Sequence, residues 1–177
     1  MLSEKRFKML ETKDLIIDKS KLSDWEGMYR NVWSRPESAR YMMWNITDSE
    51  EKAKIRMQKT IEWQKEHDTF SVYEKSSAEP IGFAGIEELG SEKYGEAGIC
   101  LGPEYTRKGY GKQILSALIE YCRDRYGAKE FIYQTREENI PSVKLAKSFG
   151  FELIGSEIKT DGRDGHEYNY FKYSKKI

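Results

Sequence analysis

The chain has 177 residues, which is enough for one domain with a sizeable core and short for two. Its 30 basic and 30 acidic side chains cancel to a formal charge of zero, so no overall field favours nucleic acid, an anionic membrane or an acidic partner. Cys100 and Cys122 are too few for a disulfide framework and lack the spacing of a zinc or redox motif. We therefore expect a single domain over residues 1–177 with no nucleic-acid or membrane partner.

The expected location is the cytoplasm. Residues 1–18 carry charges throughout and contain no apolar stretch typical of a signal peptide, and no later apolar run has the length of a membrane span. The low cysteine content fits a reducing compartment.

The chain begins with a predicted strand and a predicted helix. Leu15–Ile17 is a short apolar run typical of a strand. Ser23 or Asp24 can cap a helix that ends near Pro36. The apolar face of this helix consists of Trp25, Met28, Tyr29 and Val32.

A second helix and three strands follow. Thr47 and Glu50 have the spacing of a capping box, which predicts an amphipathic helix over roughly residues 48–67. Alternating apolar residues then predict a meander of three strands. These strands contain Phe70 and Val72, then Ile81, Phe83 and Ile86, then Ile99 and Leu101.

The last part of the chain returns to helical periodicity twice. Its expected elements are a helix from Gly109 to Gly127, a strand at 131–133, a helix from Asn139 to Gly150, and a hairpin of 151–158 and 166–173. This order of elements predicts an α/β (α+β) domain with one mixed sheet and helices that cover its faces.

Residues 101–112, LGPEYTRKGYGK, join a predicted strand to a predicted helix through a loop with two glycines. Free N–H groups in the first turn of a helix, together with the helix dipole, favour an anion there. Gly109 and Gly111 allow a pyrophosphate to approach the backbone, and Arg107, Lys108 and Lys112 add positive charge. Two glycines can also serve only to form a turn, so the loop alone does not identify a ligand.

Two other phosphate-binding motifs do not match this loop. Gln113 follows Lys112, and no glycine lies five residues before Gly111, so the loop is not a Walker A motif. Ile114 stands where a dinucleotide fingerprint has its third glycine. A nucleotide triphosphatase or a dinucleotide-dependent enzyme is therefore not expected.

The loop and a second segment together resemble the signatures of the GNAT superfamily of acetyltransferases. Thr106, Gly109 and Gly111 match the spacing of that family's acetyl-CoA loop, although Thr106 replaces the usual Arg or Gln. Residues 139–151, NIPSVKLAKSFGF, resemble the next signature, which runs from an Asn to a Gly-Phe pair. The order of elements is similar over nearly the whole chain, and LETKDLIID at 10–18 resembles the opening of the RimJ/RimL-type branch.

The resemblance implies a GNAT fold with a mixed central sheet of about seven strands, of which the fourth and fifth splay apart. The pantetheine arm of acetyl-CoA would lie in this gap and pair with the strand edge like an added peptide strand. Asn139 would bind it from the other side while also capping its helix. No metal is expected. The implied cofactor-binding residues are Ile99, Cys100, Leu101, Thr106, Arg107, Lys108, Gly109, Tyr110, Gly111, Lys112, Asn139 and Ser142.

Transfer of an acetyl group to an amine needs a proton acceptor, because only the unprotonated amine attacks a thioester. Glu96, at the start of the fourth strand, is the candidate catalytic base. Glu87 and Glu88, near the end of the previous strand, are its rivals. Each of the three also has the ordinary explanation of a solvated strand residue.

The departing thiolate of coenzyme A is stabilised by a proton donor, and many family members use a Tyr where this chain has Ala146. The alternatives are the hydroxyl of Ser142, a nearby residue such as Tyr110, or water. A small residue such as Ser142 also occurs at helix starts for structural reasons alone. Backbone groups near Cys100 and Leu101 can polarise the thioester carbonyl.

Other reactive residues do not form a recognised motif. Cys100 as a nucleophile, with His67 or His166 as its base, has no recognised context, and two histidines do not indicate a zinc site. By the same resemblance, the stretch of aromatic and Met side chains that borders the acceptor site comprises Trp33, Tyr41, Met42, Met43 and Trp44.

The sequence therefore predicts an acetyl-CoA-dependent N-acetyltransferase that acts on a primary amine, carried by a protein amino terminus or a small molecule. A non-catalytic domain that binds or senses acyl-CoA is the alternative, because Thr106 and Ala146 depart from the family pattern. A nucleotide-binding module is a third hypothesis that rests on the glycine loop alone. The identity of the acceptor and the assembly state stay open, with a homodimer as one option.

Overall fold

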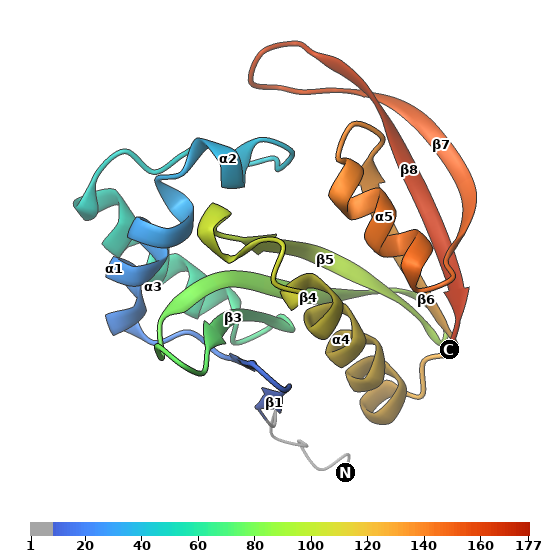
Figure 1. Cartoon of the computed structure of the whole chain (residues 1–177), viewed down its shortest axis with the longest axis horizontal. Coiled ribbons are helices and arrows are strands. Elements are labelled where there is room, and N and C mark those ends of the chain that lie inside the picture. Colours follow the sequence, from blue (N-terminus) through green and yellow to red (C-terminus); the bar gives the residue numbers. More distant parts are fainter. Residues whose placement is uncertain (1–8) are drawn as a thin grey trace.

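The computed structural model describes residues 9–177; residues 1–8, part of the stretch expected to lack a signal peptide, lie outside the described residues. One eight-stranded sheet runs through the molecule in the order β1-β2-β3-β4-β5-β6-β8-β7 (Figure 1). The strands are β1 (Leu10–Glu11), β2 (Leu15–Asp18), β3 (Thr69–Glu74), β4 (Pro80–Gly90), β5 (Lys93–Leu101), β6 (Glu130–Arg136), β7 (Glu152–Thr160) and β8 (Glu167–Lys176). The strands expected from the sequence are all present, and the two-residue β1 is an addition.

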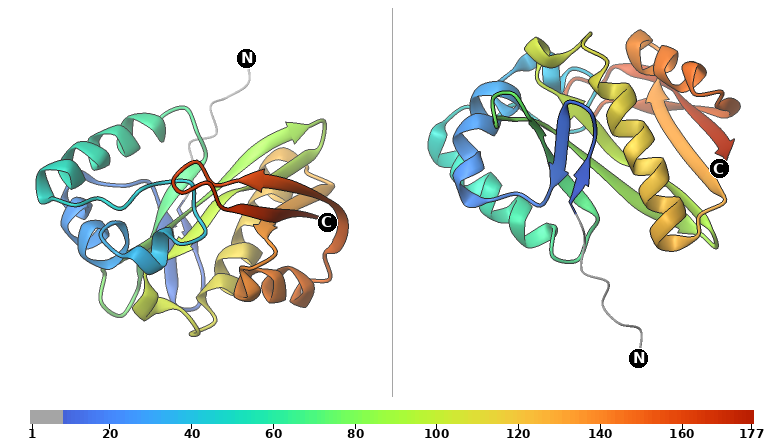
Figure 2. Two further views of the ribbon diagram at one scale, coloured as in Figure 1. Left: turned by 90° about the horizontal axis from the view of Figure 1, so that it is seen from above. Right: turned by 60° about the horizontal axis from the view of Figure 1, so that its bottom comes forward.

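Helices cover both faces of this sheet, as predicted (Figures 1 and 2). They are α1 (Trp25–Met28), α2 (Pro36–Ala39), α3 (Glu50–Trp63), α4 (Tyr110–Tyr126) and α5 (Ile140–Ser148). The main core contains Leu118 of α4 and Phe131 of β6, both 0% exposed. A second core joins α1 and α3 through Met28 and Met57. The sheet is therefore buried between two apolar layers.

The start of α3 differs from the prediction. Ser49, rather than Thr47, is the N-cap, and its hydroxyl accepts a hydrogen bond from the backbone N–H of Lys52 at 3.3 Å. The Thr47 hydroxyl instead accepts a hydrogen bond from Arg56 at 3.0 Å. The capping-box prediction was therefore wrong by two residues, because a contact with Arg56 of the same helix occupies the hydroxyl of Thr47.

Asp24 is the N-cap residue of α1, one of the two predicted, but its side chain makes no capping hydrogen bond to this helix. The helical path begins earlier, with a 3-10 turn at Leu22–Asp24 that leads directly into α1 and then into a π-helical turn at Tyr29–Trp33. The Asp24 carboxylate accepts a hydrogen bond from the backbone N–H of Lys21 at 2.6 Å, and no side chain caps α1. The preceding turn thus takes over the role of the cap.

The two strands at the centre of the sheet separate after a short ladder. β5 and β6 are the parallel pair, and their register ends with Gly95 opposite Ile132. Beyond that point β5 continues to Leu101 beside β4, while β6 continues beside β8. The predicted splay between the fourth and fifth strands, β5 and β6 here, is confirmed.

The carboxylate of Glu96 lies where the strands part. Gln134 of β6 directs its backbone N–H to Glu96 Oε1 at 3.3 Å, so a side chain replaces the backbone acceptor that a continuous ladder would offer. The backbone N–H of Gly98 donates to Glu96 Oε2 at 2.6 Å. Gly98 has a φ of +110°, and the register with β4 shifts here, as in a β-bulge. Bulge and carboxylate together fix the point of separation.

The chain ends in the predicted hairpin. β7 pairs with β8, which in turn pairs with β6, so β7 is the edge of the sheet. The turn between them is closed by the N–H of Asp161, which donates to His166 O at 2.8 Å. In residues 9–177, no helix is both long enough and apolar enough to cross a membrane.

Candidate active site

The glycine loop opens α4 as an anion-binding turn would. Gly109 precedes the helix with a φ of +81°, a left-handed conformation that glycine adopts without strain. Within the described part of the chain, no protein group accepts a hydrogen bond from the backbone N–H groups of residues 107–112. Residues 106–109 are exposed. These donors are therefore available to an anion at the positive end of the helix dipole.

A cavity of about 490 Å³ lies beside this turn, between α4, α5 and the separated half of β5. Most of the predicted cofactor-binding residues line it: Ile99, Leu101, Thr106, Arg107, Gly109, Tyr110, Gly111, Lys112, Asn139 and Ser142. We call it the cofactor cavity.

Cys100 and Lys108 are predicted cofactor-binding residues that do not line the cofactor cavity. Cys100 packs in the second core with Met57 on the opposite face of the sheet. Lys108 turns away, and its ammonium lies 3.5 Å from the carboxylate of Glu74. The sequence could not distinguish these two residues from those that line the cavity, because the side chains of successive residues on a strand or loop point in different directions.

The free edge of β5 faces the cofactor cavity with alternate peptide groups. Gly102 donates its N–H to Ile81 of β4 at 2.8 Å. Because bonded and non-bonded pairs alternate in an antiparallel ladder, Cys100 also directs its peptide groups to β4. Ile99 and Leu101 therefore direct theirs toward the gap, where an amide-containing ligand can pair with them, although the Leu101 carbonyl also accepts a hydrogen bond from Ser38 Oγ at 3.4 Å.

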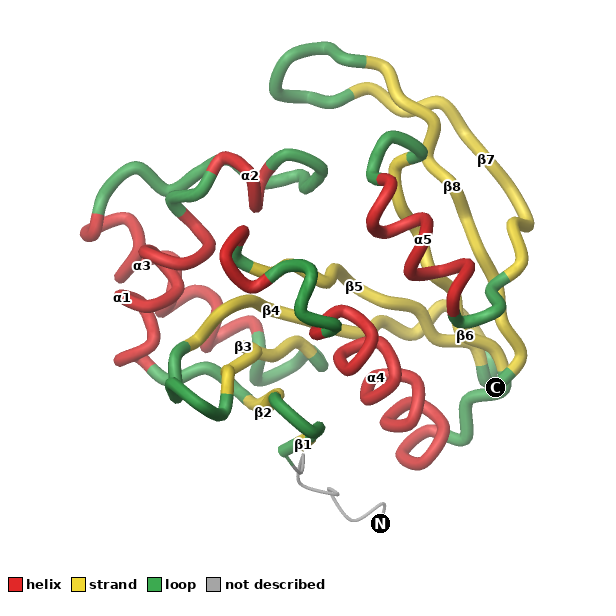
Figure 3. The backbone as a smooth tube through the Cα atoms, viewed as in Figure 1, coloured by secondary structure: helices red, strands yellow, loops and turns green. Residues whose placement is uncertain are grey.

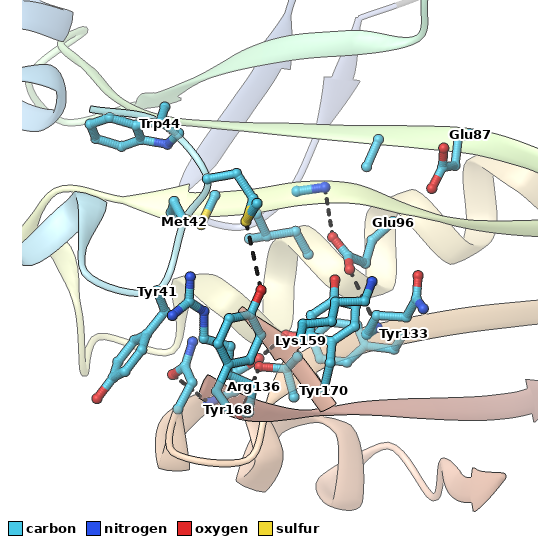
Figure 4. A pocket seen from close by; sticks show the side chains of 18 of the residues that line it. Tyr41, Met42, Trp44, Glu87, Glu96, Tyr133, Arg136, Lys159, Tyr168 and Tyr170 are labelled. Carbon is cyan, nitrogen blue, oxygen red and sulfur yellow. Dashed lines mark hydrogen bonds between the residues drawn. The ribbon is translucent and has the colours of Figure 1, made fainter. Parts of the chain in front are cut away.

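A second cavity, of about 480 Å³, lies on the other side of the gap (Figure 4). We call it the acceptor cavity. Its walls come from the loop after α2, from β5 and β6, and from the hairpin, and include Tyr41, Trp44, Glu96, Tyr133 and Tyr170. Four residues line both cavities, namely Ile99, Tyr133, Asn139 and Ser142. The two cavities therefore meet in the gap between the separated strands.

Two hydroxyl groups are joined at this junction. The Tyr133 hydroxyl and Ser142 Oγ lie 2.8 Å apart, and either can donate to the other. Burial, followed by the nearby charge of Glu96, raises the pKa of Tyr133, so its hydroxyl stays protonated around neutral pH. Asn139 Oδ1 accepts from the N–H of Ser142 at 3.4 Å as the helix N-cap, which leaves the Asn139 amide N–H groups for a ligand.

Glu96 lines the acceptor cavity close to this junction. Burial raises the pKa of Glu96 to about 8, an effect that the hydrogen bonds from Gly98 and Gln134 oppose and the charge of Glu87 assists. A carboxyl group with this pKa exchanges protons near neutral pH, which suits a general base. Of its rivals, Glu87 also lines this cavity, whereas Glu88 lines a different one.

The structure removes two of the other chemical alternatives. The Tyr110 hydroxyl donates to Glu74 at 2.6 Å and is therefore engaged away from the junction. Burial raises the pKa of Cys100 to about 12, which leaves its thiol unreactive. His67 stacks on Trp63 at the end of α3, outside both cavities. In residues 9–177, no group of three or more His, Cys, Asp or Glu side chains is arranged to hold a metal ion.

The apolar stretch predicted to border the acceptor site does so in part. Tyr41, Met42, Met43 and Trp44 line the acceptor cavity, as Figure 4 shows for three of them. Trp33 does not, because it is 2% exposed in the second core.

Sequence reasoning missed four residues that line the acceptor cavity from the end of β6 and the hairpin: Arg136, Lys159, Tyr168 and Tyr170 (Figure 4). It also missed the position of Tyr133 at the junction. Side chains alternate between the two faces of the predicted strand at 131–133, so Tyr133 must lie on one of them. The sequence of the strand alone does not indicate which face lines a cavity.

Comparison with known proteins identifies the family. The model of the acetyltransferase (GNAT) domain matches residues 14–152. The uncharacterized N-acetyltransferase p20 of Bacillus licheniformis is 29% identical over 151 residues, which cover 82% of this chain and 83% of p20.

Two solved structures share the fold. The ribosomal L7/L12 alpha-N-protein acetyltransferase RimL, in complex with coenzyme A, has a TM-score of 0.80 and 17% identity over 96% of this chain and 98% of RimL. The microcin C7 self-immunity acetyltransferase MccE, in complex with acetyl-CoA and AMP, has a TM-score of 0.79 and 20% identity over 94% of both chains. Together with the family match, this fold shows that the chain belongs to the GNAT superfamily of acetyltransferases.

Proposed function

We propose that this protein transfers the acetyl group of acetyl-CoA to a primary amine, carried by a protein amino terminus or a small molecule. The observation that carries the proposal is the meeting of the cofactor and acceptor cavities at Ile99, Tyr133, Asn139 and Ser142. A donor thioester and an acceptor amine that enter from opposite sides would come together there, which is the main requirement of a direct transfer.

The residues of the cofactor cavity fit acetyl-CoA. The N–H groups of residues 107–112, which donate to no group in residues 9–177, and the side chains of Arg107 and Lys112 suit a pyrophosphate. The peptide groups of Ile99 and Leu101 and the free amide of Asn139 suit the two amides of pantetheine. RimL and MccE, which share this fold, were solved with coenzyme A and acetyl-CoA. Acetyl-CoA supplies an acetyl group activated as a thioester.

Glu96 is the residue that we assign to proton removal. As the amine nitrogen forms its bond to the thioester carbon and the carbon–sulfur bond breaks, the nitrogen must lose a proton. The Glu96 carboxylate can accept it directly or through one water molecule, because Glu96 lines the cavity that would hold the amine. Its raised pKa makes it a stronger base than an exposed carboxylate.

Ser142 and Tyr133 are the residues that we assign to the departing sulfur. In the arrangement that we propose, the Tyr133 hydroxyl donates to Ser142 Oγ, and Ser142 donates its own proton toward the thiolate. Ala146, where many family members have a Tyr, is 0% exposed in the main core. A proton donor from that position is therefore absent, and the hydroxyl pair takes its place.

The direct test is release of the coenzyme A thiol in the presence of a panel of amines that includes peptides, polyamines and amino acids. The proposal expects release that depends on the added amine and an acetylated amine detectable by mass spectrometry. Binding of acetyl-CoA without transfer to any amine would instead support the acyl-CoA-binding alternative. Stronger thermal stabilisation by ATP than by acetyl-CoA would favour the nucleotide-binding hypothesis.

Gly111→Val tests the phosphate loop. A Cβ atom at Gly111 meets only Leu145 Cδ2, at 3.5 Å, so the fold accommodates it, but the branched side chain would obstruct a pyrophosphate. We expect acetyl-CoA affinity to fall by about tenfold or more, as for the loss of one charge-assisted hydrogen bond. Gly155→Val is the control, because a Cβ atom there meets nothing within 4 Å. Equal affinities of the two variants by calorimetry would refute the loop assignment.

Glu96→Gln tests the base. A base must be ionised to act, so kcat/KM of the wild-type protein should rise with pH and level off above about 8, the pKa of Glu96. The variant should lose this rise and, above pH 8, about 100-fold in rate. The amine chosen for this test should have a pKa well below 7, so that its own titration does not contribute to the pH profile. An unchanged pH profile in the variant would remove Glu96 from the mechanism.

Ser142→Ala tests the proton donor. We expect kcat to fall about tenfold or more while the dissociation constant of acetyl-CoA changes little, because the hydroxyl acts mainly as the sulfur departs. Ser116→Ala on α4 is a matched control, since its hydroxyl donates to the Glu120 carboxylate at 3.4 Å and Ser116 lines neither cavity. The assignment fails if steady-state kinetics give the same kcat for both variants.

A further inference from the structure

The acceptor cavity is built by two segments that are distant in the sequence. One is the segment 39–44, which begins at the last residue of α2 and contributes Tyr41 and Trp44; we call it the acceptor loop. The other is the β7–β8 hairpin, which contributes Lys159, Tyr168 and Tyr170. The hairpin turn reaches across the gap toward the end of α2 (Figure 3). The dimensions of the cavity therefore depend on what holds these segments together.

Arg163, in the hairpin turn, connects them. Its Nη1 donates to the backbone carbonyls of Ala39 at 2.8 Å and Trp44 at 3.3 Å, and its Nη2 donates to that of Arg40 at 3.3 Å. These carbonyls lie at the two ends of the acceptor loop. One guanidinium group thus holds the loop at both ends, with the aromatic side chains that line the cavity between them.

The acceptor loop has little other backbone support. Residues 40–49 contain no helix or strand. Within residues 9–177, the backbone hydrogen bond of the loop itself runs from the N–H of Met42 to Ala39 O at 3.0 Å, and the next along the chain runs from the N–H of Thr47 to Trp33 O at 2.8 Å. A loop with few internal hydrogen bonds opens readily unless a tertiary contact restrains it.

Arg163 is itself held rigidly. Asp161 accepts from Arg163 Nε at 2.9 Å and Nη2 at 2.6 Å, and from the backbone N–H of Arg163 at 3.0 Å. Asp161 also accepts from Arg136 at 2.8 Å, and the Arg136 and Asp161 side chains are 3% and 4% exposed. Arg136 lines the acceptor cavity and lies 3.8 Å from the centre of the Tyr168 ring. The two arginines and the aspartate form one fixed group behind the cavity wall.

We propose that Arg163 is a positioning residue for the acceptor: it holds the acceptor loop in the conformation that shapes the acceptor cavity. This proposal rests on the proposed function, because it concerns the amine that the cavity would receive. None of Ala39, Arg40, Trp44, Asp161 or Arg163 lines the cofactor cavity. Loss of the Arg163 contacts should thus weaken acceptor binding and leave acetyl-CoA binding intact.

The kinetic test compares Arg163→Gln and Arg163→Lys with wild type and with Arg123→Gln. Arg123 is an exposed arginine of α4, 3.5 Å from Asp124, and its replacement removes the same charge. We expect Arg163→Gln to raise the acceptor KM about tenfold, with acetyl-CoA affinity within about twofold of wild type. Arg163→Lys should recover part of the loss, because an ammonium can still donate to carbonyl groups. Arg123→Gln should behave as wild type.

A general loss of stability would give a different result. It would lower the active fraction and hence kcat, with the acceptor KM unchanged and the melting temperature reduced. That result, or equal acceptor KM values for Arg163→Gln and wild type, would overturn the proposal.

Hydrogen exchange tests the same proposal without activity. In Arg163→Gln, the amides of Met42 and Thr47 should exchange at least about tenfold faster than in wild type, while those of α4 keep their rates. Unchanged exchange at Met42 and Thr47 would overturn the positioning role. If wild-type protein transfers acetyl groups to no amine but the loop amides respond as expected, the proposed function fails and the structural role of Arg163 stands.

Discussion

The separation of β5 from β6 is the feature on which the rest of the site depends. A parallel ladder normally continues for the length of the shorter strand, because each unpaired buried N–H or C=O group costs free energy. Here the ladder ends at Gly95 and Ile132, and the carboxylate of Glu96 accepts the next inward N–H, that of Gln134. Where the strands separate, a side chain thus accepts the hydrogen bond of a backbone N–H on β6, while the backbone groups on the free edge of β5 stay open to a ligand.

The same carboxylate connects the architecture to the chemistry. Glu96 is partly buried where the two strands part, and this loss of solvent around its carboxylate raises its pKa into the range where a base is useful. The residues opposite, Tyr133 and Ser142, are hydrogen-bonded to each other at the junction of the two cavities. In the account that we propose, the opening of the sheet positions the donor, the acceptor and the proton-transfer groups together.

Much of the fold could be predicted from the sequence, because the apolar residues of α3, α4 and the strands recur with a clear period. Glycines such as Gly127 also mark where a helix ends. The phosphate loop could be located because its glycines are close in sequence. Arg163 could not be assigned from the sequence, because it contacts the acceptor loop, which lies more than a hundred residues away along the chain. Tyr133 could not be assigned, because its role depends on the gap onto which β6 opens. The cap at Ser49 was missed for a more local reason, because the Thr47 hydroxyl accepts a hydrogen bond from Arg56 of the same helix and the Ser49 hydroxyl caps it instead.

A crystal structure of the protein with coenzyme A measures the central feature most directly. We predict pantetheine in the gap between β5 and β6, with its amides paired to the peptide groups of Ile99 and Leu101 and its sulfur beside Ser142 and Tyr133. Coenzyme A bound elsewhere, or a gap that closes into a continuous β5–β6 ladder when the ligand is present, would contradict it.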